Sequence, residues 1–448
     1  MDHTPRSELK ALLRSGLSKS LVSLLIKVAT AGLTYAMYVI LSRSMGADEY
    51  GYFAFGLSLA TILAIGANFG QQTAILRYWP EDMVAGRPHR ARSALRSGGA
   101  ITLIAGLVIS AGVVAVAASA GLMTRDPVAH LFAAAALVLP LAFAEYWSSV
   151  LRAQGSVWTG LAPRDLVWRL VLPLAVLALW GVGVMLSGWA ALLLTSATLA
   201  LALALQFGLA RRRRYDIAIG VDTLKAYWAE RGAASRSFFL GTVLDSAALN
   251  MDTIFVGLLV APAVAGTYFN AFRTAGLLTL FMFAITLVVA PMVSRHYHAG
   301  EMKKAQAITA LCAWAGFLFS LVVFAGFLVF GDQVMGLFGG SHEQGALLLV
   351  ILSIGLLFDA ATGPSRIVMM MTGHERAYVR IFGVAILIGM VVQVPVIMAY
   401  GALGAAIVNT LARIAAQLAI AWYSHRRIGL DTTLLGAFLV GSRVDRAA

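Results

Sequence analysis

Apolar stretches of about 20 residues or more follow one another along the chain, the length that an α-helix needs to cross a bilayer. Short polar segments separate them, such as RSMGADEYG at 43–51. The short alternating segments of a membrane β-barrel are not visible. Because backbone polar groups in a membrane must be satisfied within their own segment, the stretches predict helices. Twelve helices are expected, near 17–42, 51–76, 98–122, 128–151, 166–186, 189–210, 237–260, 267–290, 306–330, 344–371, 379–399 and 402–423.

The composition supports a membrane protein. Only 12% of the 448 residues are charged and 60% are hydrophobic, whereas a soluble domain carries roughly 25% charged residues. So little charge cannot cover an aqueous surface, and the solvent is therefore largely lipid. The first apolar run is too long for a cleaved signal peptide and predicts a retained helix. The predicted fold class is an all-α polytopic membrane protein.

Motifs for cofactors and metals are absent from the sequence. The single cysteine, Cys312, excludes an intrachain disulfide and a CxxC pair. No HExxH, HxxxH or GxxxxGK[ST] sequence occurs. We expect no cofactor, no metal and no catalytic residue.

Positive charge predicts the orientation in the membrane, because cytoplasmic loops are enriched in lysine and arginine. With the N-terminus inside, 27 of the 34 lysines and arginines fall on the cytoplasmic side, and only Arg43 and Arg125 fall outside. Both termini are therefore expected in the cytoplasm. The four arginines at 211–214 are interpreted as the flank of a membrane helix rather than as a nucleic-acid site.

The sequence also contains a weak internal repeat. EYGYFAF at 49–55 aligns with VAGTYFNAF at 264–272, and Gly155 aligns with Gly373, at spacings of 215 to 218 residues. Six helices per repeat give both halves the same orientation, so we expect two six-helix bundles related by a pseudo-two-fold axis along the membrane normal. The expected parts are a cytoplasmic segment (1–16), an N-terminal bundle (17–210), a basic cytoplasmic linker (211–236), a C-terminal bundle (237–423) and a cytoplasmic tail (424–448).

Polar residues gather on single faces of the first, second and fourth helices and of their repeat partners. An ionisable group at membrane depth costs about 2.5–3.5 kcal/mol, so such residues should face a hydrated cavity or one another. Asp252 is a candidate partner of Arg273, and Asp359 of Arg366. For Arg169 and Glu145, which lie near the inner surface, snorkelling is an alternative. The last helix adds Asn409, Arg413 and Gln417.

One segment in each half of the repeat resembles a known family. Arg43, Gly46 and Glu49-Tyr50-Gly51 resemble the first inter-helix signature of bacterial polysaccharide biosynthesis transporters, with Met45 where leucine is usual. The family's helix 7 pattern is matched by Asp252, Gly257, Gly266, Tyr268 and Ala271. The similarity runs over essentially the whole chain. It is specific for the multidrug/oligosaccharidyl-lipid/polysaccharide exporter superfamily and, more narrowly, for lipid-linked oligosaccharide flippases.

This resemblance implies transport of undecaprenyl-pyrophosphate-linked oligosaccharide units across the inner membrane by ion-coupled alternating access, for exopolysaccharide or O-antigen-type synthesis. The expected partners are the lipid-linked substrate and membrane lipid, with a polysaccharide polymerase as a candidate and no nucleic acid; we expect a monomer. The expected substrate-binding residues are Lys27, Arg273, Arg366, Arg413, Asn68, Gln71 and Asn270. The expected ion-coupling residues are Asp252, Asp359, Asp245 and Glu145.

Two rival functions stay open at this point. A drug or cation antiporter of the same superfamily would favour a cavity of net negative charge, whereas the membrane-embedded ionisable groups here are five cations against four anions. A membrane polysaccharide polymerase or ligase would need an exposed catalytic loop on the outer side. The longest expected outer connection, at 331–343, has only 13 residues.

Overall fold

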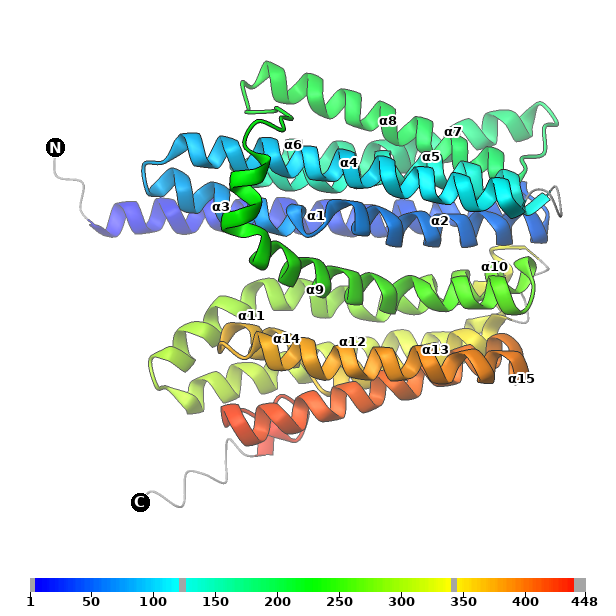
Figure 1. Ribbon diagram of the computed structural model, residues 1–448. Helices are drawn as coiled ribbons and strands as arrows, with labels where there is room; N and C mark the ends of the chain where they lie inside the picture. The colour runs from blue at the N-terminus through cyan, green and yellow to red at the C-terminus, as the bar shows by residue number, and fades with distance from the viewer. Residues whose placement is uncertain (1–4, 121–125, 340–344, 439–448) are drawn as a thin grey trace. The chain divides into compact units, whose positions relative to one another are not determined.

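The computed structural model describes residues 5–120, 126–339 and 345–438 (Figure 1). Within these residues the chain is helical and contains no strand, which confirms the all-α fold class. The chain forms two compact units, Met1–Met251 and Asp252–Ala448. The division falls inside one long helix, α9 (Leu224–Leu259), and the domain boundaries expected from the sequence remain predictions.

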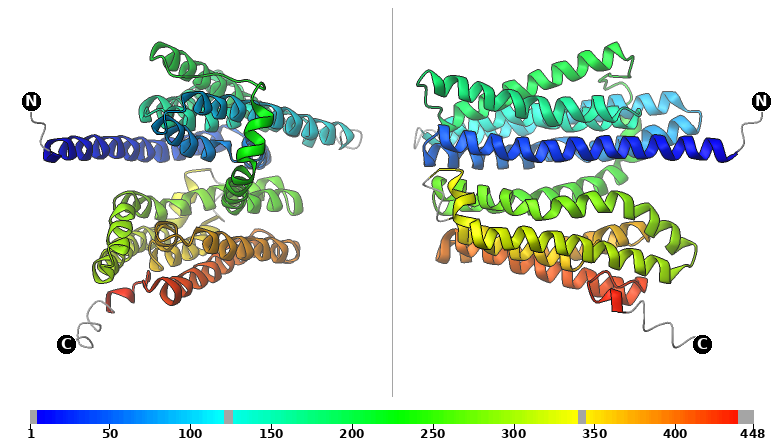
Figure 2. Two further views of the ribbon diagram at one scale, coloured as in Figure 1. Left: turned by 60° about the vertical axis from the view of Figure 1, so that its left-hand side comes forward. Right: turned by 180° about the vertical axis from the view of Figure 1, so that it is seen from behind.

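The first unit is built around the helix α5 (Asp126–Ala153), which packs against α2, α4 and α8. The other helices of the first unit are α1 (Pro5–Ser44), α2 (Ala47–Asn68), α3 (Gln71–Val84), α4 (Pro88–Ala120), α6 (Val157–Ala162), η1 (Pro163–Val167), α7 (Trp168–Gly181) and α8 (Gly188–Arg212). Of these, α1 lies along the α6–α7 segment, as Figure 2 shows from behind.

The second unit is built around α13 (Gly345–Ala361), which packs against α10, α12 and α15. The central helices α5 and α13 correspond to the fourth and tenth expected spans, so both units use the same span of the repeat as their core. The remaining elements are α10 (Pro262–Ala275), η2 (Gly276–Thr279), α11 (Leu280–His298), α12 (Met302–Gly336), α14 (Ser365–Met371), α15 (Glu375–Tyr423) and η4 (Ser424–Ile428).

Nine helices in the described residues are long and apolar enough to cross a membrane, or ten when the bent pair α13–α14 counts as one span. Two features keep this number below twelve. The α15 helix is interrupted at Gly401, where φ is 60° and ψ is −144°. The α6–α7 segment is divided by a π-helical turn into pieces too short to be counted alone. The number twelve stays a prediction.

Several helix ends differ from those expected. The second span breaks at Phe69–Gly70 instead of running through to residue 76, because both residues adopt positive φ. The α12 helix continues to Gly336, so the first part of the connection expected at 331–343 is helical. Residues 340–343 of that connection, and Arg125, lie outside the described residues. The turn between α11 and α12 holds Glu301, and hydrogen bonds from Lys304 and His296 keep the pKa of its carboxyl below the usual value.

The repeat is visible in the backbone turns that close equivalent helices. The Ser156 N–H donates to the Leu151 carbonyl (2.9 Å) around Gly155, and the His374 N–H donates to the Met369 carbonyl (2.8 Å) around Gly373. Both glycines have positive φ, 92° and 81°, as helix-ending turns of this type require. The two turns lie 218 positions apart. The pseudo-two-fold axis itself remains a prediction.

A similar side-chain contact follows α8 in the first unit and η4 in the second. In the first unit, the Asp216 N–H donates to the Gln154 side chain (2.8 Å), which donates back to the Asp216 carbonyl (2.8 Å). In the second unit, Asp431 makes the same paired contact with Gln306, at 2.8 and 2.7 Å. The two aspartates lie 215 positions apart. In each unit, a glutamine amide thus ties the segment after α8 or η4 to another part of the same unit.

The polar segment at 43–51 joins three helix ends of the first unit. The Glu49 carboxylate accepts the N–H of Gly188 (2.5 Å), the first residue of α8, and lies 3.3 Å from Nε2 of His130. A carboxylate at a helix N-terminus is favourable because the helix dipole is positive there. Gly188 has no room for a side chain, since a Cβ would meet the Glu49 carbonyl and the His130 ring. Glu49, in the polar segment between the first two spans, therefore joins the N-terminal ends of α2, α5 and α8, which are predicted to lie on the outer side.

Candidate functional site

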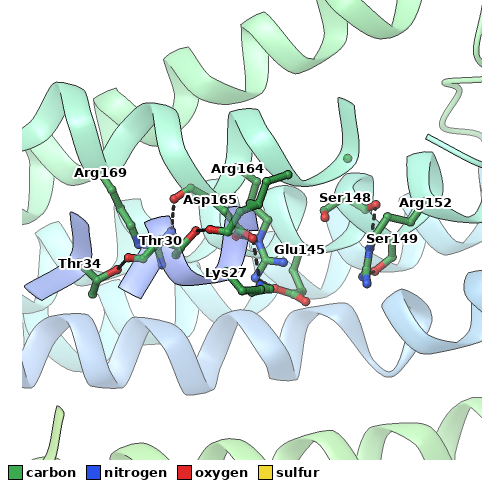
Figure 3. Close-up of polar contacts among 12 residues, drawn as sticks. Lys27, Thr30, Thr34, Glu145, Ser148, Ser149, Arg152, Arg164, Asp165 and Arg169 are labelled. Atoms are coloured by element: carbon green, nitrogen blue, oxygen red, sulfur yellow. Dashed lines mark hydrogen bonds and ion pairs between the residues drawn. The ribbon is translucent and has the colours of Figure 1, made fainter. Parts of the chain in front are cut away.

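Four basic and two acidic side chains gather in the first unit where α1, α5 and the α6–α7 segment meet (Figure 3). The Lys27 ammonium lies 2.9 Å from a carboxylate oxygen of Asp165. Arg164 pairs with Glu145, and its Nε lies 3.6 Å from the other oxygen of Asp165. We call this set the basic cluster; its members are Lys27, Arg152, Arg164, Arg169, Glu145 and Asp165.

A π-helical turn, Pro163–Val167, brings the two central members of the basic cluster into place. It adds one residue per turn between α6 and α7, and such turns are frequent at functional sites. The Asp165 side chain is only 3% exposed. Arg169 donates from Nη1 to the Asp165 carbonyl (3.0 Å) and lies over the Trp168 ring at 4.4 Å. The turn therefore holds one buried carboxylate among several cations.

The basic cluster carries more positive than negative charge and has a partly open edge. The side chains of Lys27, Arg164 and Glu145 are 35%, 24% and 30% exposed, in contrast to Asp165. Four cations face two carboxylates, which leaves two positive charges in excess. Guanidinium and ammonium groups in this arrangement match an anion with several oxygens, such as a phosphate or diphosphate.

The hydroxyl groups around the basic cluster form hydrogen bonds mostly within their own helices. Thr30 and Thr34 donate to the carbonyls of Ile26 and Thr30, each at 2.6 Å. Arg152 donates from Nη2 to the Ser149 hydroxyl (2.9 Å) on the same helix. The polar face expected on the first helix thus supplies Lys27 as its charged group.

Asn68 and Gln71, which we expected to bind substrate, lie inside the first unit. Both side chains are buried, at 0% and 1% exposure. Asn68 accepts a hydrogen bond from Thr102 (3.3 Å), and Gln71 accepts one from the Tyr227 hydroxyl (2.7 Å). These contacts join α2 and α3 to α4 and α9. A role in substrate binding remains a prediction.

In the second unit, the C-terminal half of α15 carries polar groups one helical turn apart, and each contacts a different helix. Asn409 donates to Asp252 of α9 (2.5 Å). Arg413 donates to Asp359 of α13 (2.8 Å). Gln417 accepts a hydrogen bond from Ser365 of α14 (3.0 Å), and the Tyr268 hydroxyl donates to Asp252 (2.7 Å). We call this set the acidic ladder; its members are Asp252, Tyr268, Asp359, Asn409, Arg413 and Gln417.

The partners of the two aspartates differ from those expected. Asp359 pairs with Arg413 instead of Arg366, because α14 is bent by 42° from α13 at Gly363–Pro364, which turns Arg366 off the face that carries Asp359. Arg366 instead lies over the Tyr378 ring (5.4 Å). Asp252 contacts Tyr268 and Asn409, whereas the Arg273 guanidinium lies over the Phe269 ring (4.9 Å).

The remaining expected site residues lie in α5, α9 and α10. Asn270 is fully buried in α10, and Asp245 is half-buried in α9 within the first unit. Glu145, expected to couple ions, lies in the basic cluster, where Arg164 neutralises it. In the part of the chain that the structure describes, no group of three or more His, Cys, Asp or Glu side chains could hold a metal ion.

Sequence reasoning missed two central residues of the basic cluster. Arg164 and Asp165 fall in a segment that hydropathy predicts to be a cytoplasmic connection, so neither was considered as membrane-embedded. The signal that could have found them is the charged pair directly after Pro163, placed between two apolar helical segments.

The fold resembles that of transporters of known structure. A multidrug resistance MATE family transporter of the MOP superfamily, in an inward-facing conformation, superposes with a TM-score of 0.68 at 16% identity, covering 92% of this chain and 98% of that one. The lipid II flippase MurJ, in an inward closed conformation, gives a TM-score of 0.66 at 12% identity, covering 94% and 91%. The chain therefore has the fold of MOP-superfamily transporters.

Sequence comparison defines the family. A model described as polysaccharide biosynthesis protein matches residues 17–297, and the MatE model matches residues 238–394. The chain belongs to the polysaccharide biosynthesis protein family, which is a family of multi-pass membrane carriers and not of enzymes.

One relative carries a functional description. The probable low-salt glycan biosynthesis flippase Agl15 of Haloferax volcanii is 24% identical over 162 residues, which cover 36% of this chain and 34% of the relative. The chain thus matches about a third of the length of this curated relative.

Proposed function

We propose that the protein is a flippase that moves a lipid-linked oligosaccharide, joined through pyrophosphate to undecaprenol, from the inner to the outer leaflet of a bacterial inner membrane. Its family membership and its likeness to a glycan biosynthesis flippase support a lipid-linked glycan as substrate. Both termini would lie in the cytoplasm, as the distribution of basic residues indicates.

The observation that carries this proposal is the excess of positive charge in the basic cluster. Lys27 and Arg164 pair with Asp165 and Glu145, Arg169 donates to the Asp165 carbonyl, and Arg152 adds a fourth cation nearby. A net positive charge around the buried Asp165 is unfavourable unless a further anion neutralises it. A pyrophosphate would supply that anion, and the forked guanidinium groups would donate pairs of hydrogen bonds to its oxygens.

The acidic ladder is the candidate site for coupling to an ion gradient. Arg413 pairs with Asp359, whereas the neutral Asn409 donates to Asp252, so the ionised set carries one negative charge in excess. A proton or a monovalent cation at Asp252 would neutralise it. An anionic substrate leaving a negative interior gains about 2.3 kcal/mol per charge per 100 mV, so coupling would serve mainly to return the empty carrier.

A drug or cation antiporter is the second candidate function. The MatE model covers residues 238–394, which include both aspartates of the acidic ladder. A cationic drug would need net negative charge at its binding site, and the basic cluster of the first unit opposes that. Polymerase or ligase activity is disfavoured by the family, although a polymerase remains a candidate partner.

Reconstituted vesicles test the proposed function. Purified protein should move a fluorescent undecaprenyl-pyrophosphate-linked oligosaccharide between leaflets and should leave the distribution of a cationic dye such as ethidium unchanged. Dye extrusion without movement of the lipid-linked sugar would favour the antiporter. Glycosyl transfer by the purified chain would favour the enzyme.

A further inference from the structure

The two halves of α15, drawn in orange to red in Figure 1, run antiparallel on either side of Gly401. A groove of about 660 Å³ lies along them. Small residues of both halves line it, and a Cβ on Gly389 would lie 3.0 Å from the Ala412 Cβ of the other half. Its walls are exposed side chains that include Val384, Ile388 and Leu411. A trough of this shape accepts one hydrocarbon chain.

Charge distinguishes one end of the groove from the other. Arg380 belongs to the groove lining, and the rest of that lining is apolar. Arg380 and Arg376 are exposed and one turn apart at the start of α15. The other half of α15 ends beside further exposed cations, Arg426 and Arg427. The basic residues therefore form a collar at the end predicted to be cytoplasmic.

The groove and the collar match the two parts of one ligand. From Arg380 to Val392 the helix rises about 18 Å at 1.5 Å per residue, roughly the depth of one leaflet. Trp422, 65% exposed, lies near the collar end of α15, and tryptophan prefers the membrane–water interface. A phosphate at Arg380 would place an attached acyl chain in the trough.

We propose that this groove, defined by Arg380, Gly389, Ala412, Ala415, Ala416 and Ala419, is a binding site for an anionic glycerophospholipid of the cytoplasmic leaflet. The phosphate contacts Arg380, and one acyl chain lies between the halves of α15. The site is separate from the basic cluster of the first unit, and the proposal does not depend on the transported substrate. Charge complementarity at Arg380 selects an anionic lipid over a zwitterionic one, and the apolar lining of the rest of the groove matches an acyl chain.

Native mass spectrometry of the full chain, released from vesicles of equal phosphatidylglycerol and phosphatidylcholine, tests the site. The wild type should retain one phosphatidylglycerol in preference to phosphatidylcholine. Arg380→Gln should reduce that preference about fivefold, since a basic residue near an anionic surface contributes about 1 kcal/mol. Arg236→Gln, which removes another exposed arginine, should leave the preference unchanged.

A second variant tests the groove without touching its charge. Ala415→Leu with Ala419→Leu fills the trough from its exposed side and should remove the retained lipid. Ala111→Leu with Ala115→Leu makes the same change at the same spacing on an exposed face of α4 and should retain it. An unchanged lipid in the filled variant, equal loss in the two pairs, or a dimer of the chain in place of the lipid would overturn the proposal.

Discussion

The Lys27 ammonium and the Asp165 carboxylate form an ion pair across α1 and the π-helical turn, with 2.9 Å between nitrogen and oxygen. The carboxylate is almost completely buried, whereas the ammonium is one-third exposed. The pair thus places an anion inside the protein and a cation at its edge. An incoming anionic group would reach Lys27 before Asp165.

Removing only the cation of this pair should destabilise the protein. Lys27→Gln removes one of the positive charges beside the buried Asp165 carboxylate, and breaking a buried ion pair costs about 3–5 kcal/mol. Because Lys27 is partly exposed, we expect a loss of about 1–3 kcal/mol in the free energy of unfolding, measured by thermal unfolding in detergent. Lys27→Gln with Asp165→Asn should recover most of it. Lys303→Gln, at an exposed position, is the control, and an equal loss in the double variant would contradict this view.

The acidic ladder predicts how transport responds to an ion gradient. Asp252→Asn keeps an oxygen that can accept from Tyr268 and Asn409 but cannot ionise. Thermal unfolding should therefore change little, while transport in vesicles should lose its response to an imposed proton or sodium gradient. Wild-type gradient dependence in this variant would assign coupling to another group.

Glycine is required at the junction of helix ends in the first unit. Gly188→Ala would push a methyl group against the Glu49 carbonyl and the His130 ring, and overpacking of this kind costs about 1–3 kcal/mol. Gly181→Ala meets no atom within 4 Å and should unfold at the wild-type temperature or slightly above it. Equal unfolding temperatures for the two variants would show that the junction tolerates the methyl group.

The repeated glutamine contact predicts that the segment after η4 is held in place. Gln306→Ala removes both hydrogen bonds to Asp431, each worth about 0.5–1.5 kcal/mol. Limited proteolysis should then cut within 429–438 several times faster than in the wild type. Gln333→Ala, an exposed position on the same helix, should show no change. Equal cleavage rates for Gln306→Ala and wild type would mean that other contacts hold the segment.

Much of the fold was predictable because membrane helices are governed by simple rules. Hydropathy located α4, α5 and α12, and the glycine turns at Gly155 and Gly373 followed from the repeat. The π-helical turn at 163–167 did not follow, because it depends on the packing around it, whereas Pro364 in the sequence indicates the bend after α13.

The candidate site was predictable in its charges but not in its pairs. Periodicity identified Lys27, Asp359 and Arg413 as polar groups of membrane helices. Their partners come from other parts of the chain, such as Asp165, 138 positions from Lys27. The expected pair of Asp359 with Arg366 placed both residues on one side of the same span, and the 42° bend between α13 and α14 separates them.

The central claim is that the basic cluster binds the pyrophosphate of a lipid-linked oligosaccharide. Its most direct test is leaflet translocation of that lipid in vesicles by the variant Lys27→Gln/Asp165→Asn, which keeps the net charge of the basic cluster and its packing but removes the exposed ammonium. We expect the initial rate to fall at least tenfold while the protein stays folded, with Lys303→Gln at the wild-type rate. A folded double variant that translocates the lipid as fast as the wild type would contradict the account.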